Sequence, residues 1–234
     1  MQRLLTPELM DDPGLDPVEH AHALRGLARL NRIARSDRIP WQGLQRWAQA
    51  SPRPGPLDVL DIATGSGDVP IGLALRARRC GLDLRLHGCD ISGVALEQAR
   101  ARARALNVEF TGFRQDAISE PFERRYDVVI CNLFLHHLTE ADAVRLLEHA
   151  AQACSGLLLV CDLRRDLLGW LLAGTFSRLV TRSRVVHVDA LKSVRAGFTP
   201  PELDRLARSA GLSDHLVHRR FPRRMLLEWR VGDG

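Results

Sequence analysis

The sequence predicts an α/β fold: a doubly wound, mostly parallel sheet of seven strands, with an antiparallel C-terminal hairpin, N-terminal helices and an inserted lid. Three observations predict it. Short apolar segments alternate with helical segments between residues 57 and 161, as in successive strand–helix–strand units. A glycine turn directly follows the first apolar segment. The last two strand-like segments flank a tight turn at Pro222, with no helix between them.

The N-terminal part of the chain is expected to precede the sheet as a helical cap. Residues 1–16 carry no clear pattern and are predicted to be loosely ordered, whereas 17–49 show helical spacing of apolar residues. The proline-rich stretch 51–56 breaks this pattern and predicts a linker. We therefore expect a cap over 1–56 and a sheet domain over 57–234, with a lid inserted at 163–198.

The alternating region supplies the first five strands. We expect strands at 57–63, about 83–89, about 108–114, 126–132 and 157–161, separated by helices that start near Asp68 and that span 92–106 and 139–154. Asp68 is a suitable N-cap, and Pro70 suits the first turn of its helix because a missing N–H costs nothing there. The segment 126–132 is almost wholly apolar, which is typical of a strand buried on both faces.

The C-terminal part departs from this rhythm. Residues 163–198 are too many for an ordinary connection and are predicted to form one or two helices over the strand ends. Thr199 and Glu202 form a capping-box pattern, and Gly211 is expected to end that helix. Segments at about 214–221 and 225–231 then predict an antiparallel hairpin at the sheet edge.

Composition narrows the functional classes. The formal net charge is +5 and the pI is about 9.4, but the basic residues alternate with acidic ones and form no block, so no nucleic-acid partner is expected. The five cysteines are scattered without metal-binding spacing, as expected for a reducing cytoplasm. No signal peptide is recognised, and the apolar run 167–176 is shorter than the roughly 20 residues of a transmembrane helix.

The stretch from Leu57 to Asp68 carries the clearest functional signal. Asp61 lies near the end of the predicted strand, and Gly65 and Gly67 follow in the turn, where the backbone can approach a ligand closely. A second strand ends at Asp90, where a carboxylate could hold ribose hydroxyls. No lysine stands there to meet a phosphate, so the pattern favours a nucleoside over a phosphate ester.

Four segments in this order resemble the motifs of the Rossmann-like S-adenosylmethionine-dependent methyltransferases. They are Val59–Gly67, Gly88–Ser92, Arg114–Ala117 and Tyr126–Leu138. The resemblance covers residues 57–162 well. It implies S-adenosylmethionine as cofactor, with the following residues around it: Asp61, Ala63, Thr64, Gly65, Ser66, Gly67, Asp90, Ile91, Asp116, Ala117 and Asn132.

The resemblance also implies individual roles. Asp61 either contacts the amino-acid portion of the cofactor or orders the glycine turn. Asp90 would accept the ribose hydroxyls; its alternative role is an N-cap for the next helix. Asp116 would contact the adenine amino group, with Ala117 packed nearby, or it is a plain loop carboxylate. Asn132 would touch the methionine part.

Two histidines follow the fourth predicted strand at the functional edge of the sheet. A histidine with a pKa near neutrality can take a proton from a phenol or an acidic carbon. We expect His136 to face the acceptor and His137 to support the loop, although either could be structural. Arg182, Arg184 and His187 in the insert could meet an acidic or phenolate acceptor or form a solvated face, and no metal-ligand set stands out.

The resulting hypothesis is a cytoplasmic methyltransferase acting on oxygen or carbon of a small aromatic or apolar acceptor. It most resembles the ubiquinone/menaquinone-type and polyketide or phenolic-lipid methyltransferases; the oligomeric state is left open. Alternatives are an RNA or protein methyltransferase, a cofactor-binding module without turnover, and a nicotinamide dehydrogenase. Asn132-Leu-Phe-Leu replaces the Asn/Asp-Pro-Pro-aromatic loop of amino methylation, and Pro70 replaces the third glycine of the dinucleotide fingerprint.

Overall fold

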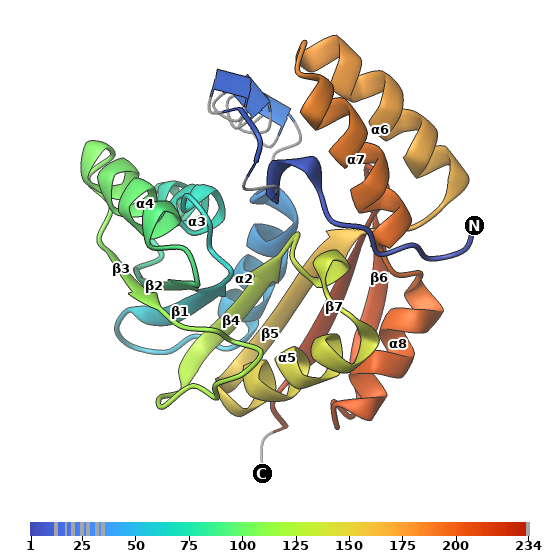
Figure 1. The fold of residues 1–234 in the computed structure, drawn as a ribbon. Helices are drawn as coiled ribbons and strands as arrows, with labels where there is room; N and C mark the ends of the chain where they lie inside the picture. The colour runs from blue at the N-terminus through green and yellow to red at the C-terminus, as the bar shows by residue number, and fades with distance from the viewer. Residues whose placement is uncertain are drawn as a thin grey trace.

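The protein folds around one seven-stranded sheet of order β3-β2-β1-β4-β5-β7-β6 (Figure 1). This computed structural model describes residues 1–11, 14–16, 18, 19, 22, 23, 26, 29, 30, 33 and 36–232. Neighbouring strands from β3 to β5 pair in parallel, while β7 pairs antiparallel with both β5 and β6. The predicted fold class is therefore confirmed, including the reversed strand in the C-terminal hairpin.

The strands match the apolar segments of the sequence. They are β1 (Leu57–Ile62), β2 (Leu84–Asp90), β3 (Phe110–Arg114), β4 (Tyr126–Asn132), β5 (Cys154–Leu163), β6 (Leu216–Arg220) and β7 (Arg224–Arg230). β5 is longer than the apolar run 157–161 that predicts it. Its last residues stay in the sheet because β7 pairs with them as far as Leu163, opposite Arg224. A long-range partner thus extends the strand beyond what its own sequence indicates.

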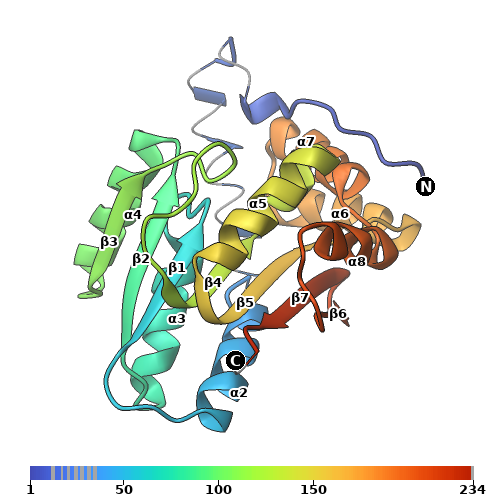
Figure 2. The same ribbon diagram turned by 90° about the horizontal axis from the view of Figure 1, so that it is seen from below.

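Helices cover both faces of the sheet (Figures 1 and 2). One apolar cluster joins α2 (Arg38–Ala50), α3 (Asp68–Arg79) and α4 (Gly93–Ala105) to the sheet, and the other joins α5 (Glu140–Gln152) and α8 (Pro200–Ser209). The part of the predicted N-terminal cap that is described without gaps packs through Trp41, Leu44 and Trp47 into the first cluster. Most of the predicted helix over 17–35 lies outside the described residues.

The start of α3 differs from the prediction. The N-cap is Gly67, in a left-handed conformation, and Asp68 is the first helical residue. Asp68 instead pairs with Arg102 of α4 and accepts the Ser66 hydroxyl. Because the left-handed Gly67 is the N-cap, α3 begins one residue earlier than it would with Asp68 as the N-cap. The first turn of α3 therefore stays close to the end of β1.

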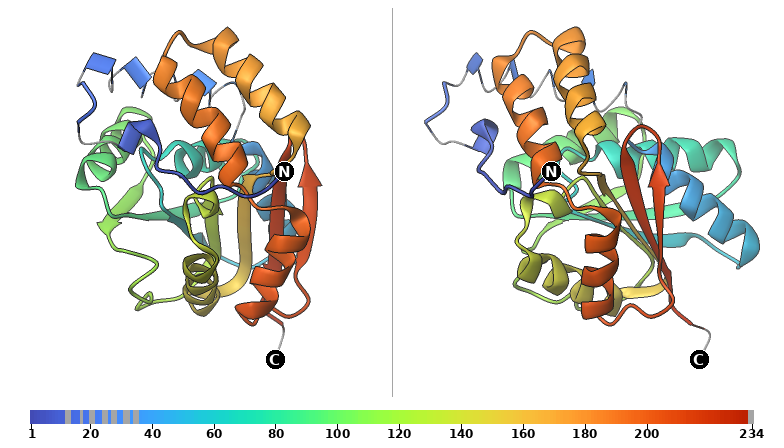
Figure 3. Two further views of the ribbon diagram at one scale, coloured as in Figure 1. Left: turned by 45° about the vertical axis from the view of Figure 1, so that its right-hand side comes forward. Right: turned by 90° about the vertical axis from the view of Figure 1, so that its right-hand side faces the viewer.

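The predicted insert contains two helices, α6 (Leu167–Val180) and α7 (Arg184–Ala196), which lie side by side beyond the strand ends (Figure 3). Between β4 and α5 a short 3₁₀ helix, η2 (Leu135–His137), occupies the same end of the sheet. A second short helix, η1 (Leu9–Asp11), belongs to the N-terminal segment. None of the described helices is long and apolar enough to cross a membrane.

The first residues of the chain are ordered by contacts, contrary to the prediction. The Leu4 N–H donates to the Arg195 carbonyl at 3.1 Å. The backbone N–H groups of Leu9 and Met10 donate to the buried Asp189 carboxylate at 2.7 and 3.0 Å, which caps η1. Residues 3–10, called here the N-terminal strap, thus bind along α7. Their own sequence carries no periodicity that could have indicated this.

Candidate functional site

The glycine turn after β1 brings the backbone into three left-handed positions. Ala63, Gly65 and Gly67 have φ of 54°, 54° and 75°. A Cβ on Gly65 would meet no atom within 4 Å, so this turn borders open space. A Cβ on Gly67 would lie 3.0 Å from both Ala99 and Ile71, where α3 and α4 approach each other. Gly65 thus leaves room for a ligand, while Gly67 allows close packing of the two helices.

Asp90 ties the glycine turn to the end of β2. Its carboxylate accepts the Gly65 N–H at 2.8 Å and the Ser92 N–H at 2.9 Å. The N-cap of α4 is Ser92, which accepts the Ala95 N–H at 3.2 Å, so Asp90 is not the cap. A carboxylate offers about four lone-pair positions, and the remaining ones are free to accept further donors. Asp90 is half-buried, and the next residue, Ile91, is exposed.

Three buried polar atoms around this turn have no hydrogen-bond partner. They are Asp61 Oδ1, Thr64 Oγ1 and Asn132 Oδ1, from the ends of β1 and β4, which are neighbours in the sheet. Buried polar groups are nearly always paired, so three orphans together point to a missing partner. Two of the atoms are acceptors and the third can accept, and this set suits a positively charged donor such as an ammonium group. We call Asp61, Thr64, Gly65, Asp90 and Asn132 the cradle.

The protonation of Asp61 is unusual. Burial raises its pKa to about 7, and the neighbouring Asp90 carboxylate contributes to the rise. The Thr64 hydroxyl is near enough to counteract part of the rise, but it makes no hydrogen bond of regular geometry. A cationic ligand would stabilise the charged form of Asp61, because an opposite charge favours ionisation. A cation bound in the cradle would therefore lower the pKa of Asp61.

The other predicted cofactor residues lie at the same sheet edge. Asp116 follows β3 and accepts the Ile118 N–H at 3.0 Å and the Ser119 hydroxyl at 2.7 Å. These bonds lower the pKa of Asp116 and hold the turn, so its carboxylate has a local structural role. Ala117 is buried, and its carbonyl accepts a hydrogen bond from His149 Nδ1 at 2.9 Å. The adenine contact of Asp116 stays a prediction.

His136 is buried and bound to an acidic residue that sequence reasoning missed. Its Nδ1 lies 2.7 Å from Asp162 Oδ1, and its backbone N–H donates to Asp162 Oδ2 at 2.9 Å. Asp162 ends β5 beside the end of β4, and it also accepts the Leu163 N–H at 2.6 Å. Burial opposes ionisation of Asp162, but the His136 ring and these N–H donors outweigh it and lower the pKa. With Nδ1 committed to a carboxylate, Nε2 is the free nitrogen of the ring.

His137 and the N-terminal strap complete this side of the site. The rings of His136 and His137 lie 4.2 Å apart between centroids. Desolvation in this cluster lowers the pKa of His137, and His136 lowers it further, so the ring is neutral at pH 7. A carboxylate oxygen of Glu8 and one ring nitrogen of each histidine lie within 4.8 Å of one another.

These three residues include donor types that a transition metal binds. The sequence shows no metal-ligand motif, and it does not indicate that Glu8 lies near His136, because 128 residues separate them and no pattern links them. Glu8 also accepts the Ser193 hydroxyl of α7, and His136 shares one nitrogen with Asp162. The cluster can hold a proton network without any ion.

Arg3 fixes the strap over the histidines. Its guanidinium donates to the Ala196 carbonyl at 2.7 Å and the Leu138 carbonyl at 2.6 Å, and it lies 3.8 Å from the centroid of the Phe198 ring. Because His136 is only 4% exposed, an acceptor can reach it only if the strap or the adjoining loop moves. The strap therefore covers His136, whereas His137 is exposed.

The predicted acceptor residues of the insert lie elsewhere. Arg182 and Arg184 are exposed at the turn between α6 and α7, and the His187 ring bonds to the Thr181 carbonyl at 2.8 Å. Within the described part of the chain, none of the three bonds to the histidine pair. A role in acceptor binding stays a prediction for them.

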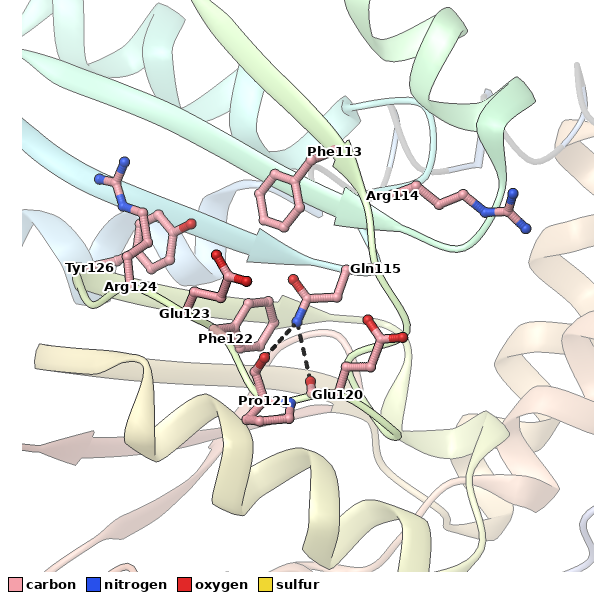
Figure 4. A pocket seen from close by; sticks show the side chains of 9 residues that line it. All are labelled: Phe113, Arg114, Gln115, Glu120, Pro121, Phe122, Glu123, Arg124 and Tyr126. Atoms are coloured by element: carbon pink, nitrogen blue, oxygen red, sulfur yellow. Dashed lines mark hydrogen bonds between the residues drawn. The ribbon is translucent and has the colours of Figure 1, made fainter.

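A surface cavity between β3 and β4 is also separate from the cradle. It measures about 330 Å³ and is lined by residues of β3, β4 and their connection, among them Gln115, whose amide donates to the Glu120 and Pro121 carbonyls (Figure 4). Neither the glycine turn nor the histidines line it.

Comparison with known proteins identifies the type of domain to which these residues belong. Residues 59–155 match the family described as "Methyltransferase domain", which confirms the sequence-based prediction of a methyltransferase domain. A release factor glutamine methyltransferase of Bacillus cereus is 38% identical over 79 residues. That alignment covers 32% of this chain and 26% of the relative, so the chain matches about a quarter of the length of this curated relative.

Solved structures resemble the whole chain at low identity. A plantazolicin methyltransferase in complex with a desmethyl-plantazolicin analogue and S-adenosylhomocysteine has a TM-score of 0.70 at 16% identity, covering 94% of this chain and 92% of its own. Magnesium protoporphyrin IX methyltransferase of Synechocystis PCC 6803, with bound S-adenosylhomocysteine, has a TM-score of 0.59 at 20% identity, covering 92% and 98%. At this identity the likeness establishes a shared fold.

Proposed function

We propose that this chain is an S-adenosylmethionine-dependent methyltransferase whose acceptor is a small aromatic or apolar molecule. The observation that carries the proposal is the cradle. Three unpartnered buried polar atoms surround a glycine turn, and a buried pair of His136 in η2 and Asp162 near the end of β5 lies at the same edge of the sheet. The matched methyltransferase domain includes the glycine turn, Asp90 and both histidines.

The chain's residues fit this cofactor. Asp61, Thr64 and Asn132 would hold its ammonium group, since their free oxygens are acceptors without donors. Asp90 would accept ribose hydroxyls with the lone pairs that its two backbone donors leave free. Asp116 and Ala117 would border the adenine. When bound, S-adenosylmethionine would supply a sulfonium methyl group for in-line transfer to the acceptor, with S-adenosylhomocysteine as the leaving group.

His136 then provides what an acceptor with a hydroxyl or an acidic carbon needs. The Asp162 carboxylate accepts the Nδ1 proton, so Nε2 holds the lone pair that can take a proton from the acceptor. Asp162 would stabilise the imidazolium that results, and the imidazolium would later release the proton to water, which regenerates the neutral imidazole. Burial of the pair and cover by the strap exclude water from the reacting atoms, and they position the acceptor.

The loop after β4 and the structural neighbours both favour a small acceptor. The Asn132-Leu-Phe-Leu sequence lacks the two prolines associated with amino methylation, which disfavours a protein glutamine like that of the Bacillus relative. Structural neighbours are named for plantazolicin and magnesium protoporphyrin IX, which are not macromolecules. Within this class, the ubiquinone/menaquinone-type or phenolic-lipid acceptors predicted from the sequence are our proposal, and Arg182, Arg184 and His187 could contact their polar end.

Two measurements test the proposal. Titration calorimetry should give micromolar binding of S-adenosylhomocysteine and no signal with NAD. Incubation with S-adenosylmethionine and a panel of phenols, quinols and polyketide-like pyrones should give one product heavier by a methyl group in mass spectrometry. Tight NAD binding would refute the assignment of S-adenosylmethionine as the cofactor. Cofactor binding with no turnover on this panel, on release-factor peptides or on RNA would favour a binding module.

A further inference from the structure

Helix α6 exposes an apolar face to solvent. Its outward side chains include Leu179, which is 84% exposed, and Leu167, which is 65% exposed. The whole face, called here the α6 face, consists of Leu167, Leu168, Leu171, Leu172, Phe176 and Leu179. Single exposed leucines are ordinary, but six large apolar residues on one helix form a contiguous patch of the kind that marks an interaction surface.

The packing of α6 explains why these residues face outward. The buried positions of α6 are the small residues Gly169, Gly174 and Ser177. A Cβ on Gly174 would lie 3.2 Å from Leu191 of α7, so α6 approaches α7 closely through its small side. An amphipathic helix normally buries its large apolar side chains in the core. Here the arrangement is inverted, and the large residues have no described neighbour to cover them.

Positive charge surrounds the α6 face at both ends. The β6–β7 hairpin carries Arg219, Arg220 and Arg223 around Phe221, which is 92% exposed, whereas the Arg224 guanidinium is buried and adds nothing to this surface. This turn adjoins the start of α6, because the Arg164 N–H donates to the Arg223 carbonyl at 3.0 Å. The sequence has no acidic residue between 167 and 188 or between 216 and 227. The nearby Asp166 is already paired with Arg164 and Arg223.

The other end of α6 borders a basic cavity. It measures about 350 Å³ and is lined by His22, Arg29, Arg178, Leu179, Val180, Thr181 and Arg182. Three guanidinium groups and an imidazole around one hollow form a site for an anionic group such as a phosphate. Leu179 belongs to both the cavity wall and the α6 face, so the basic and apolar surfaces are continuous.

We propose that the α6 face is a docking surface for an anionic lipid membrane. The helix would lie in the interface with its leucines and Phe221 in the acyl boundary, the arginines among the headgroups and one phosphate in the basic cavity. Apolar area combined with flanking basic residues is the combination that holds interfacial helices on such membranes. This mode needs no helix that spans the bilayer.

Charge distinguishes this occupant from a second copy of the chain. Both ends of α6 carry arginines, so two copies packed face to face would oppose arginines in either orientation. Such like-charge contacts weaken an interface. A membrane with anionic headgroups instead complements both ends at once. The inference goes beyond the proposed function and does not depend on it, since membrane binding requires neither cofactor nor acceptor.

Membrane docking would also orient the candidate site. α6 follows the end of β5, which carries Asp162, and α7 contacts both α6 and η2, which carries the histidines. The docked helix and the site therefore lie at the same end of the sheet (Figure 3). A chain held in this way would present that end to molecules dissolved in the membrane.

Flotation of the full chain with lipid vesicles tests the proposal. The chain should bind vesicles that contain a quarter phosphatidylglycerol in phosphatidylcholine and should bind pure phosphatidylcholine at least tenfold more weakly. The double variant Leu171→Glu/Leu172→Glu should reduce binding at least about tenfold, whereas the matched control Val94→Glu/Leu216→Glu, on exposed residues elsewhere, should not. Arg182→Gln should weaken binding about fivefold, compared with Arg104→Gln on α4.

Circular dichroism and the melting temperature establish whether each variant folds, and all these positions are exposed. Absence of vesicle binding in the natural chain would overturn the proposal, as would equal losses in the leucine and control variants. Light scattering that reports a dimer, dispersed by Leu171→Glu/Leu172→Glu without any vesicle binding, would assign the face to a second copy instead. Vesicle binding by a chain that binds no S-adenosylhomocysteine would support this inference and refute the proposed function.

Discussion

The cradle and the acceptor side of the site are built in different ways. The cradle comes from one strand–turn–helix unit and the next strand end, within residues 57–92, plus Asn132. The acceptor side joins residues 3–8 of the strap, His136 and His137 of η2, Asp162 of β5 and Ala196 of α7. The first is local in sequence, whereas the second is assembled from distant segments.

This difference has a functional consequence. A local turn that sets its own geometry suits a ligand that stays the same, as a cofactor does. A surface assembled from the chain's N-terminus and an inserted helix can change without disturbing the sheet, because such segments are peripheral to the core. Substitutions in the cradle are therefore expected to change the affinity for the cofactor. Substitutions on the acceptor side are expected to change kcat or the KM for the acceptor.

The largest effect is expected for His136→Gln. Loss of the base should reduce turnover roughly 10²–10⁴-fold, the usual contribution of general base catalysis. The affinity for S-adenosylhomocysteine in calorimetry should stay nearly constant, because the cradle is intact. The loss should shrink at high pH, where the acceptor ionises without help.

His137→Ala is the matched control for that variant. It should lower thermal stability or loop order more than turnover. Full activity of the His136 variant across pH, together with a folded but inactive His137 variant, would reverse the two assignments.

Asp162→Asn should have the next largest effect, about 10- to 10³-fold on turnover. An amide can present its N–H to His136 Nδ1, which moves the proton to Nε2 and removes the lone pair needed there. The pH–rate profile distinguishes this positioning role from a structural one, since loss of the lone pair at Nε2 should change the shape of the profile and not only the maximal rate. An unchanged profile in a folded variant would mean that Asp162 only supports the loop.

The sequence predicts most of the cradle and little of the acceptor side. The β1 turn and the roles proposed for Gly65 and Asp90 depend on neighbours within a few residues or on the next strand, which sequence pattern records. Asp162 directly follows the fifth predicted strand, 157–161, yet nothing local distinguishes it from an ordinary strand-end carboxylate. Glu8 reaches the site through a contact with α7, and Arg3 through contacts with α7, Leu138 and Phe198. Tertiary contacts of that kind leave no periodicity in the sequence.

Asp90→Ala tests the role of Asp90 in the cradle. Removal of the ribose acceptor should weaken binding of S-adenosylhomocysteine by on the order of 1.5–3 kcal/mol. The Gly65 and Ser92 N–H groups also lose their acceptor, so the glycine turn should become looser while the fold survives. Calorimetry on a variant with an unchanged circular dichroism spectrum is the measurement, and unchanged affinity would remove the ribose assignment.

Asp61→Asn should separate stability from binding. With a pKa of about 7, the folded chain keeps a proton at Asp61 that the unfolded chain releases near pH 4. Stability should therefore fall as pH rises from about 4 to 7 and level off above that. The Asn variant should lack this slope and be more stable than the natural chain by about 1–3 kcal/mol at pH 8.

The same variant should bind S-adenosylhomocysteine about tenfold more weakly, since an amide does not attract the ammonium group as a carboxylate does. In the natural chain, binding below pH 7 should release a proton, and affinity should rise between pH 6 and 7. Thermal melts and calorimetry over this range measure both effects. If the pH slope of stability persisted in the variant, another group would be responsible for it.

The smallest effect is expected for Arg3→Ala, which loosens the strap. Because the bonds of Arg3 to Leu138 and Ala196 close the strap over a nearly inaccessible His136, the variant should hold the acceptor less well. We expect KM for the acceptor to rise about two- to tenfold, with a smaller change in kcat and none in cofactor affinity. Arg104→Ala on α4 controls for the loss of one positive charge. A fall in KM would instead mean that the strap obstructs entry more than it retains the acceptor, and the acceptor side would then be gated by its cover and not completed by it.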